Sequence, residues 1–225
     1  MASTNERTKD KLTNGAKARR RYRLADGSPV PGVTTVTGLL NKPQLVRWAN
    51  KLGLDGIDCG NYTDATAQVG TLAHAMIQAD LQGTAFDRAA WSPDQLLLGE
   101  NALGRFYEWK KRHSVEPICC ETPFVSEAMR YGGTVDCYCL LDGRPTLLDF
   151  KTGRAIYEEG FVQLAAYARL LEEIGLPVED CRILRVGRSE AEGFEERSVG
   201  EREKWFQVFE HMLNVYYLKK DLGWK

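Results

Sequence analysis

The sequence predicts an α/β or α+β fold in which a mixed central β-sheet is flanked by helices. Three observations lead to this fold class. Amphipathic helical patterns fill residues 34–113, β-rich segments fill most of 117–199, and a last helical pattern occupies 201–220. A further helical pattern interrupts the strands after the third of them. The predicted order of elements is helices, three strands, a helix, a strand and a helix. This order is typical of a sheet that contains both parallel and antiparallel pairs.

The composition is that of an ordinary soluble globular protein. The chain has 225 residues, of which 43% are hydrophobic and 27% charged. No apolar run approaches the ~18 residues that a membrane span requires. The N-terminus has no apolar core and does not read as a secretory signal. The six cysteines of the chain form no CxxC pair, which favours buried free thiols in a reducing, cytoplasmic setting.

Charge is unevenly distributed along the chain. Residues 1–23 contain eight basic residues against Glu6 and Asp10, a net charge of +6, which leaves −7 on the rest of the chain. We expect residues 1–20 to be a basic, disordered arm and residues 21–225 to be a single domain. Such an arm suits contact with a polyanion, and by composition alone a solvated tail is equally consistent.

The helical segment divides at its glycines and prolines. Residues 22–33 contain Asp-Gly and two prolines, which predicts a turn or loop with a short strand. Residues 34–54 fit two short amphipathic helices broken near Pro43. A strong helix follows over 64–81, with Thr63 or Asp64 available as N-cap. The next helix runs over 92–113, with proline in its first turn.

The sheet begins after this segment. Strands are expected at 117–126, then at two runs joined by the turn signal Asp142-Gly143, the second being 146–151. A helix over 158–174 ends at a glycine, which is a common C-terminal signal. Another strand is expected at 181–187, and 193–199 reads as an edge strand or a loop. The last helix carries regularly spaced aromatic residues, which favours core packing.

Two acids and a lysine are the main chemical signal. Asp149 and Lys151 lie two residues apart on one strand and therefore point to the same face. The hairpin can bring Asp136 close to Asp149. Such a cluster is costly unless something binds there, and a divalent metal with oxygen ligands would explain it. An exposed charge pair is the alternative, and the apolar residues before Asp149 argue against it.

Four further residues could belong to this site. His74 follows Gly70 by one helical turn, which suits a ligand among small residues, although a lone helix histidine is more often structural. Gln163 and Tyr167 share one helix face and could orient a water or a phosphate; otherwise Tyr167 is a core residue. Glu121 is either a further acid near the metal or an exposed strand residue.

Taken together, five motifs resemble the PD-(D/E)xK nuclease superfamily, specifically its RecB-like, Cas4-like exonuclease group. The motifs are GTLAH (70–74), Glu121, GGTVD (132–136), LDFKTG (148–153) and QLAAY (163–167). Residues 31–49 also resemble the start of phage-type recombination exonucleases of this group. The second acid is aspartate, where glutamate is commoner. Only Cys181 follows the QxxxY motif, so no iron–sulfur cluster is expected.

The resemblance implies a restriction-endonuclease-like core and a role for each matched residue. Asp136, Asp149 and the Phe150 carbonyl would hold Mg²⁺ or Mn²⁺, with His74 at a second metal position. Lys151 would orient or help deprotonate the attacking water and stabilise charge on the phosphate. Gln163 and Tyr167 would position the substrate or the lysine.

The same resemblance implies where DNA would be held. Thr34 and Thr35 could hold a 5′ phosphate through their hydroxyl groups, and basic residues could contact the backbone. Trp48 could stack on a base, although a core position is the more frequent one for tryptophan. The basic candidates are Arg19, Arg20, Arg21, Arg23 and Arg47.

The expected function is a metal-dependent DNA exonuclease that acts in recombination or end-processing, in the cytoplasm of a bacterium or of a phage-infected host cell. Alternatives are a structure-selective endonuclease with the same site, an inactive DNA-binding module, and a small-molecule binding protein. Expected partners are linear DNA ends, single-stranded ends among them, and a recombinase or annealing protein. A homo-oligomer is a further option, and no membrane contact is expected.

Overall fold

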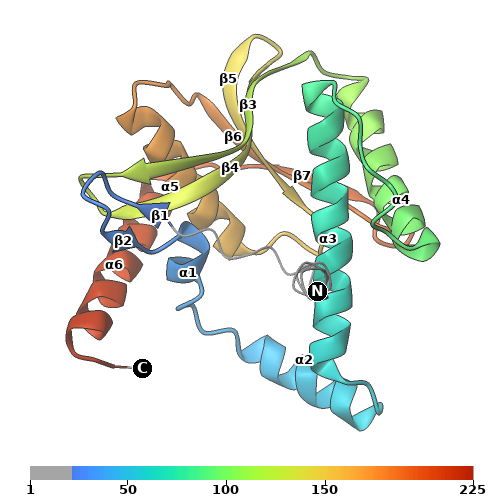
Figure 1. The fold of residues 1–225 in the computed structure, drawn as a ribbon, viewed down its shortest axis with the longest axis horizontal. Helices are drawn as coiled ribbons and strands as arrows, with labels where there is room; N and C mark the ends of the chain where they lie inside the picture. Colours follow the sequence, from blue (N-terminus) through green and yellow to red (C-terminus); the bar gives the residue numbers. More distant parts are fainter. Residues whose placement is uncertain (1–21, 225) are drawn as a thin grey trace, which may run out of the picture.

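The centre of the molecule is a five-stranded sheet (Figure 1). A computed structural model describes residues 22–224, so the predicted arm at 1–20 lies outside the described residues. The strand order is β3-β4-β5-β6-β7; β5 and β6 pair in parallel and the other neighbours are antiparallel. The strands are β3 (Val115–Ser126), β4 (Tyr131–Leu141), β5 (Arg144–Lys151), β6 (Asp180–Val186) and β7 (Phe194–Ser198).

The sheet is flanked by helices, which confirms the predicted fold class and is consistent with a restriction-endonuclease-like core. A small hairpin, β1 (Tyr22–Arg23) and β2 (Pro29–Val30), precedes them. α5 connects the two parallel strands, as a parallel pair requires. The helices are α1 (Val33–Thr37), α2 (Pro43–Leu54), α3 (Cys59–Gln82), α4 (Pro93–Lys110), α5 (Glu158–Glu173) and α6 (Arg202–Asp221).

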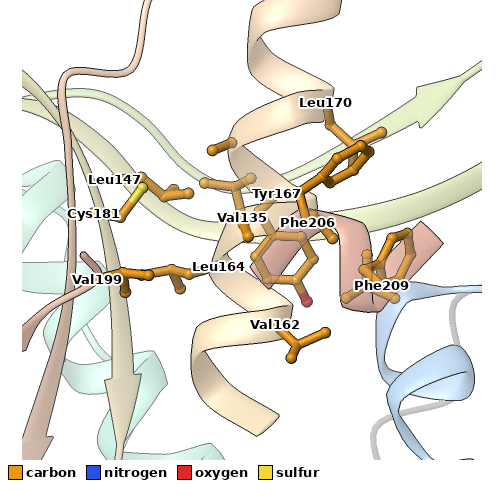
Figure 2. Close-up of a cluster of buried hydrophobic side chains, with 14 of the residues drawn as sticks. Val135, Leu147, Val162, Leu164, Tyr167, Leu170, Cys181, Val199, Phe206 and Phe209 are labelled. Carbon is orange, nitrogen blue, oxygen red and sulfur yellow. The ribbon is translucent and has the colours of Figure 1, made fainter. Parts of the chain in front are cut away.

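Each face of the sheet has its own hydrophobic core. α5, α6 and α1 cover one face, and α3 and α4 cover the other (Figure 1). Neighbouring residues of β5 show the alternation directly, because Leu147 belongs to the α5 core and Leu148 to the α3 core. Figure 2 shows the α5 core, where the ring of Tyr167 packs among Val135, Val162 and Phe206. The predicted aromatic packing of the last helix is present in Phe206 and Phe209.

A two-residue turn joins β4 to β5 at the predicted Asp-Gly signal. Leu141 pairs with Arg144 across it, and the turn residues Asp142 and Gly143 both have positive φ, 51° and 80°. Positive φ at both positions suits the type I′ geometry that matches the twist of a hairpin. A hydrogen bond from a residue outside the hairpin also stabilises the turn, because the Ser114 N–H donates to the Asp142 carboxylate at 2.8 Å.

The start of α3 and the surroundings of Trp48 differ from the sequence prediction, and the open choice between strand and loop at 193–199 is resolved. α3 begins at Cys59 because the Asp58 carboxylate accepts the Asn61 N–H at 2.7 Å, so the helix starts before the predicted cap. The 193–199 segment is a strand, β7. α2 has no buried residue, so Trp48 does not lie in a core; its ring is half-buried, 5.8 Å from that of Tyr62.

The cysteines are free thiols. Cys120, Cys137 and Cys139 fill the α3 core, and Cys181 fills the α5 core. Cys59 and Cys119 are half-buried, so the prediction of burial is wrong for these two. None of the helices between residues 22 and 224 combines the length and the hydropathy that crossing a bilayer requires.

Candidate active site

The candidate site lies where β4 and β5 separate. Their pairing runs from Leu141–Arg144 to Cys137–Leu148 and stops before Asp136 and Asp149 are reached. Beyond that point, the Phe150 N–H donates to the Asp136 Oδ2 at 3.0 Å, so a carboxylate replaces the strand carbonyl as acceptor. The separation leaves room for side chains between the strands, and it places both acids at the same end of the sheet.

His74, Glu121 and Asp136 form a compact group. One potential ligand atom from each lies within 4.8 Å of the other two, and such a group could hold a metal ion. The His74 Nδ1 is 3.5 Å from Asp136 Oδ2 and 3.9 Å from Glu121 Oε1. All three side chains are half-buried. α3, β3 and β4 each contribute one residue, so the group depends on tertiary packing.

Backbone geometry at two positions helps to bring these residues together. Glu121 has φ +47°, a left-handed conformation that is costly for a residue with a side chain and is concentrated at functional sites. Gly70 lies one helical turn before His74, and a Cβ there would be 3.0 Å from the Thr152 Oγ1. A glycine therefore lets α3 approach the segment that follows Lys151.

A chain of polar contacts leads from β5 to α5. The Lys151 Nζ lies 2.8 Å from Asp149 Oδ2, and it donates to Asp149 Oδ1 at 3.0 Å and to Gln163 Oε1 at 3.1 Å. The Gln163 Nε2 in turn donates to the Tyr167 hydroxyl at 3.0 Å. The lysine ammonium group is thus held by two side chains, one on its own strand and one on α5.

Burial and neighbouring charges shift the pKa values of the ionisable groups in this series of contacts. Burial raises the pKa of Asp149, Lys151 opposes the rise and Asp136 adds to it, and together these effects bring the pKa to about 6. Burial alone would lower the pKa of Lys151, but Asp149 and Asp136 outweigh it and the pKa is raised. Burial, then Asp136 and Asp149, raises the pKa of Tyr167 well above its usual range. At neutral pH the lysine is therefore a cation and the tyrosine a neutral phenol.

Tyr167 reaches this position because β4 has a glycine opposite it. A Cβ at Gly133 would lie 2.3 Å from the Tyr167 Cε1, so any larger residue would displace the ring. Gly132 has the same relation to Tyr22, with 2.5 Å to its Cγ. Packing therefore explains the two glycines of the GGTVD motif, because each is in close contact with a tyrosine, one on each face of the strand.

The donor set suits a divalent metal. Carboxylate oxygens are the preferred ligands of Mg²⁺ and Mn²⁺, and Glu121 and Asp136 supply them. The Asp149 Oδ2 is buried and makes no hydrogen bond, although it lies next to the lysine ammonium group. Asp149 is not part of the compact group; its carboxylate contacts Lys151 instead. Whether the Phe150 carbonyl is a ligand stays a prediction.

Four of the seven predicted DNA-contact residues lie in the part of the chain that the structure describes. Arg19, Arg20 and Arg21 fall outside the described residues. Arg23 is exposed in β1 and donates to the Gly27 carbonyl at 2.6 Å. In α1, Thr34 is exposed and Thr35 half-buried, and Arg47 is exposed on α2. Their role as phosphate contacts stays a prediction.

One interaction near the site had no clear sequence signal. The Glu159 carboxylate accepts from the Thr37 hydroxyl at 3.1 Å and forms an ion pair with Lys42. It thereby joins the α1–α2 segment to the start of α5, close enough to Lys151 to raise the pKa of the lysine. Glu159 lies in the first turn of α5, where acids are common, so its position in the sequence did not predict these contacts.

Comparisons with known proteins give distant matches among solved structures. A candidate exonuclease from Eubacterium rectale aligns over 70% of this chain and 69% of its own, with 12% identity and a TM-score of 0.48. An alkaline exonuclease from Laribacter hongkongensis aligns over 68% of this chain and 84% of its own, with 14% identity and a TM-score of 0.34. The same enzyme in complex with dAMP also matches, with 13% identity and a TM-score of 0.33. No protein-family model and no curated protein matches the sequence.

Proposed function

We propose that this protein is a Mg²⁺- or Mn²⁺-dependent deoxyribonuclease that degrades DNA from its ends. The observation that carries the proposal is the convergence of the His74–Glu121–Asp136 group with Lys151 where β4 and β5 separate. Phosphodiester hydrolysis needs a positioned water, a group that withdraws charge from the phosphate, and a fixed geometry. Each of these requirements has a candidate residue here.

A metal held by His74, Glu121 and Asp136, with Asp149 and the Phe150 carbonyl as further oxygen ligands, would supply charge neutralisation and an activated water. The bond to the leaving oxygen breaks as water adds to phosphorus, and negative charge develops on the phosphate oxygens. Lys151 is placed to donate to one of these oxygens, because a protonated lysine has three donors and two already contact Asp149 and Gln163.

Gln163 and Tyr167 act as positioning residues. The amide accepts from the Lys151 ammonium group through its oxygen and donates to Tyr167 through its nitrogen, so its orientation is determined at both ends. Tyr167 is held in turn by close packing against Gly133. This arrangement reduces the freedom of the lysine before the substrate arrives, which favours preorganised charge stabilisation.

We place the protein in the PD-(D/E)xK superfamily, within its RecB-like, Cas4-like and phage-type recombination group. The order of the motifs supports this placement, as does a mixed sheet whose parallel pair contains the Asp-x-Lys strand. Linear DNA ends are the proposed substrate, and a recombinase or annealing protein is the proposed partner. Residues 1–23, with their net charge of +6, would add sequence-independent phosphate contacts, as would Arg47, Thr34 and Thr35.

End-labelled linear DNA and closed circular DNA, each incubated with Mg²⁺, with Mn²⁺ and with EDTA, test this proposal. We expect metal-dependent loss of the linear DNA while the circle stays intact, and the order of label release gives the polarity. Cutting of the circle would support a structure-selective endonuclease with the same site. Binding without cleavage in every metal would contradict the proposed activity and support an inactive DNA-binding module.

A further inference from the structure

A pocket of about 270 Å³ opens beside Lys151. It lies between the end of β5, the 153–157 segment and the first turns of α5, with Ile183 of β6 as its floor. Gly160 contributes no side chain to it; a Cβ there would lie 2.8 Å from the Ile183 Cδ1. Its lining comprises Lys151, Gly153, Ala155, Ile156, Tyr157, Glu159, Gly160, Gln163 and Ile183.

The walls combine apolar surface with one exposed aromatic ring. Ile156 and Ile183 are buried and Ala155 is half-buried. Tyr157 is 63% exposed although it lines the pocket, and its side chain makes no capping bond at the start of α5. A largely exposed aromatic ring next to a small apolar hollow is suited to stacking on a planar ligand.

The carboxylate and the amide that line the pocket already have partners. The Glu159 carboxylate contacts Thr37 and Lys42, and the Gln163 amide contacts Lys151 and Tyr167 through both of its ends. Reading the edge of a base requires donors and acceptors that are available to the ligand. The pocket therefore offers shape and stacking, and little discrimination among bases.

We propose that this pocket holds the sugar and base of one nucleotide next to the scissile phosphate, with Tyr157 stacking on the base. This inference rests on the proposed nuclease function, because that function places the phosphate at Lys151, which forms one wall of the pocket. Because the pocket adjoins the position of that phosphate, the sugar attached to the phosphate can place its base in the pocket. The volume is below the 300–1,000 Å³ typical of pockets for drug-sized ligands, so it fits a single nucleoside and not a stacked pair.

Binding of the four deoxynucleoside 5′- and 3′-monophosphates to the full chain in EDTA tests the pocket without cleavage. We expect one of the two series to bind, with all four bases within about threefold of one another because base edges are not read. Tyr157→Ala should weaken this binding about fivefold or more through loss of stacking, and Tyr157→Phe should stay within about twofold. Tyr107→Ala removes another exposed tyrosine, on α4, and should leave binding unchanged.

Cleavage kinetics separate this inference from the proposed function. With metal, Tyr157→Ala should raise KM and the inhibition constant of the bound monophosphate by similar factors, with kcat within about twofold. Unchanged monophosphate binding in Tyr157→Ala, or no binding by an active wild-type enzyme, would overturn the pocket and leave the nuclease intact. A wild-type protein that binds monophosphates through Tyr157 but cleaves no DNA would support the pocket and contradict the nuclease.

Discussion

At the scale of single residues, the site depends on how Lys151 is held. Its ammonium group lies between the Asp149 carboxylate and the Gln163 amide oxygen, and the carboxylates keep its pKa raised. A cation that is fixed before the substrate binds can stabilise charge that develops later without reorganisation. Its side chain is not a member of the His74–Glu121–Asp136 group, so its contribution and that of the metal can be separated by experiment.

Replacement of Lys151 by alanine should lower the rate of cleavage at saturating metal about 10²–10³-fold, the usual effect of removing one charge-stabilising donor. The affinity for Mg²⁺, measured from the metal dependence of the rate, should change little. Lys111→Ala, an exposed lysine at the end of α4, serves as the matched control. A variant with normal turnover but weak metal binding would remove Lys151 from its proposed role.

Sequence spacing predicted part of this residue-scale arrangement. Strand alternation predicted that Asp149 and Lys151 share a face, and helical spacing predicted the same for Gln163 and Tyr167; the contacts between them bear this out. Spacing could not predict the left-handed backbone at Glu121, since no local signal marks it. It also could not predict the Glu159 contacts, which join residues that are far apart in the sequence.

At the scale of elements, β4 is fitted between two tyrosines. Gly132 and Gly133 point to opposite faces, and each is in contact with a ring that leaves no room for a Cβ. Tyr22 belongs to the β1–β2 hairpin and Tyr167 to α5. One pair of glycines therefore sets how closely the N-terminal hairpin and the helix that carries Gln163 approach the strand that carries Asp136.

Gly133→Ala should therefore destabilise the fold, by about 1–3 kcal/mol as for other overpacked core positions. The reason is the 2.3 Å separation that its Cβ would have from the Tyr167 ring. Thermal unfolding measures the effect, and a loss of activity below the unfolding transition would show that the Tyr167–Gln163 contact is disturbed as well. Gly104→Ala on α4, where a Cβ meets nothing within 4 Å, is the control and should leave stability equal or higher. Equal melting temperatures for Gly133→Ala and wild type would contradict the packing argument.

Most elements followed from periodicity and end signals, and the exceptions have physical reasons. The proline in the first turn of α4 and the Asp142-Gly143 turn are local signals, so their effects could be predicted from the sequence. The predicted start of α3 was wrong because this part of the sequence offers several plausible N-cap residues. The one whose side chain accepts a backbone N–H of the first turn is Asp58. An amphipathic pattern predicted α2 as a helix, but a pattern does not say which neighbour covers it, and none of its residues is buried.

At the scale of the whole molecule, charge is separated between the N-terminus and the rest. The first described residue, Tyr22, donates or accepts a hydrogen bond at 2.9 Å with Thr134, which lies two residues before Asp136. Tyr22 therefore contacts the strand that carries Asp136. Because the remainder of the protein carries −7, phosphate contacts from residues 1–23 would offset repulsion between DNA and the body of the protein.

Deletion of residues 1–20 should weaken DNA binding at moderate salt and leave kcat at saturating DNA unchanged. Each phosphate contact that is lost should reduce the slope of log K against log salt by about 0.7–0.9. Fluorescence anisotropy over a salt series in EDTA measures both quantities. A full-length variant with Lys and Arg of this segment changed to Gln separates charge from length. Identical slopes for the deleted and complete chains would support a solvated tail.

The central claim is that the His74–Glu121–Asp136 group holds the metal for hydrolysis, and a Mg²⁺ titration of single-turnover cleavage tests it most directly. The substrate is end-labelled linear DNA, and the proteins are wild type, Asp136→Asn and Asp64→Asn, an exposed aspartate on α3. We predict that Asp136→Asn needs at least about tenfold more Mg²⁺ and cleaves far more slowly, while Asp64→Asn matches wild type. An Asp136→Asn protein with the metal dependence and rate of wild type would contradict the account.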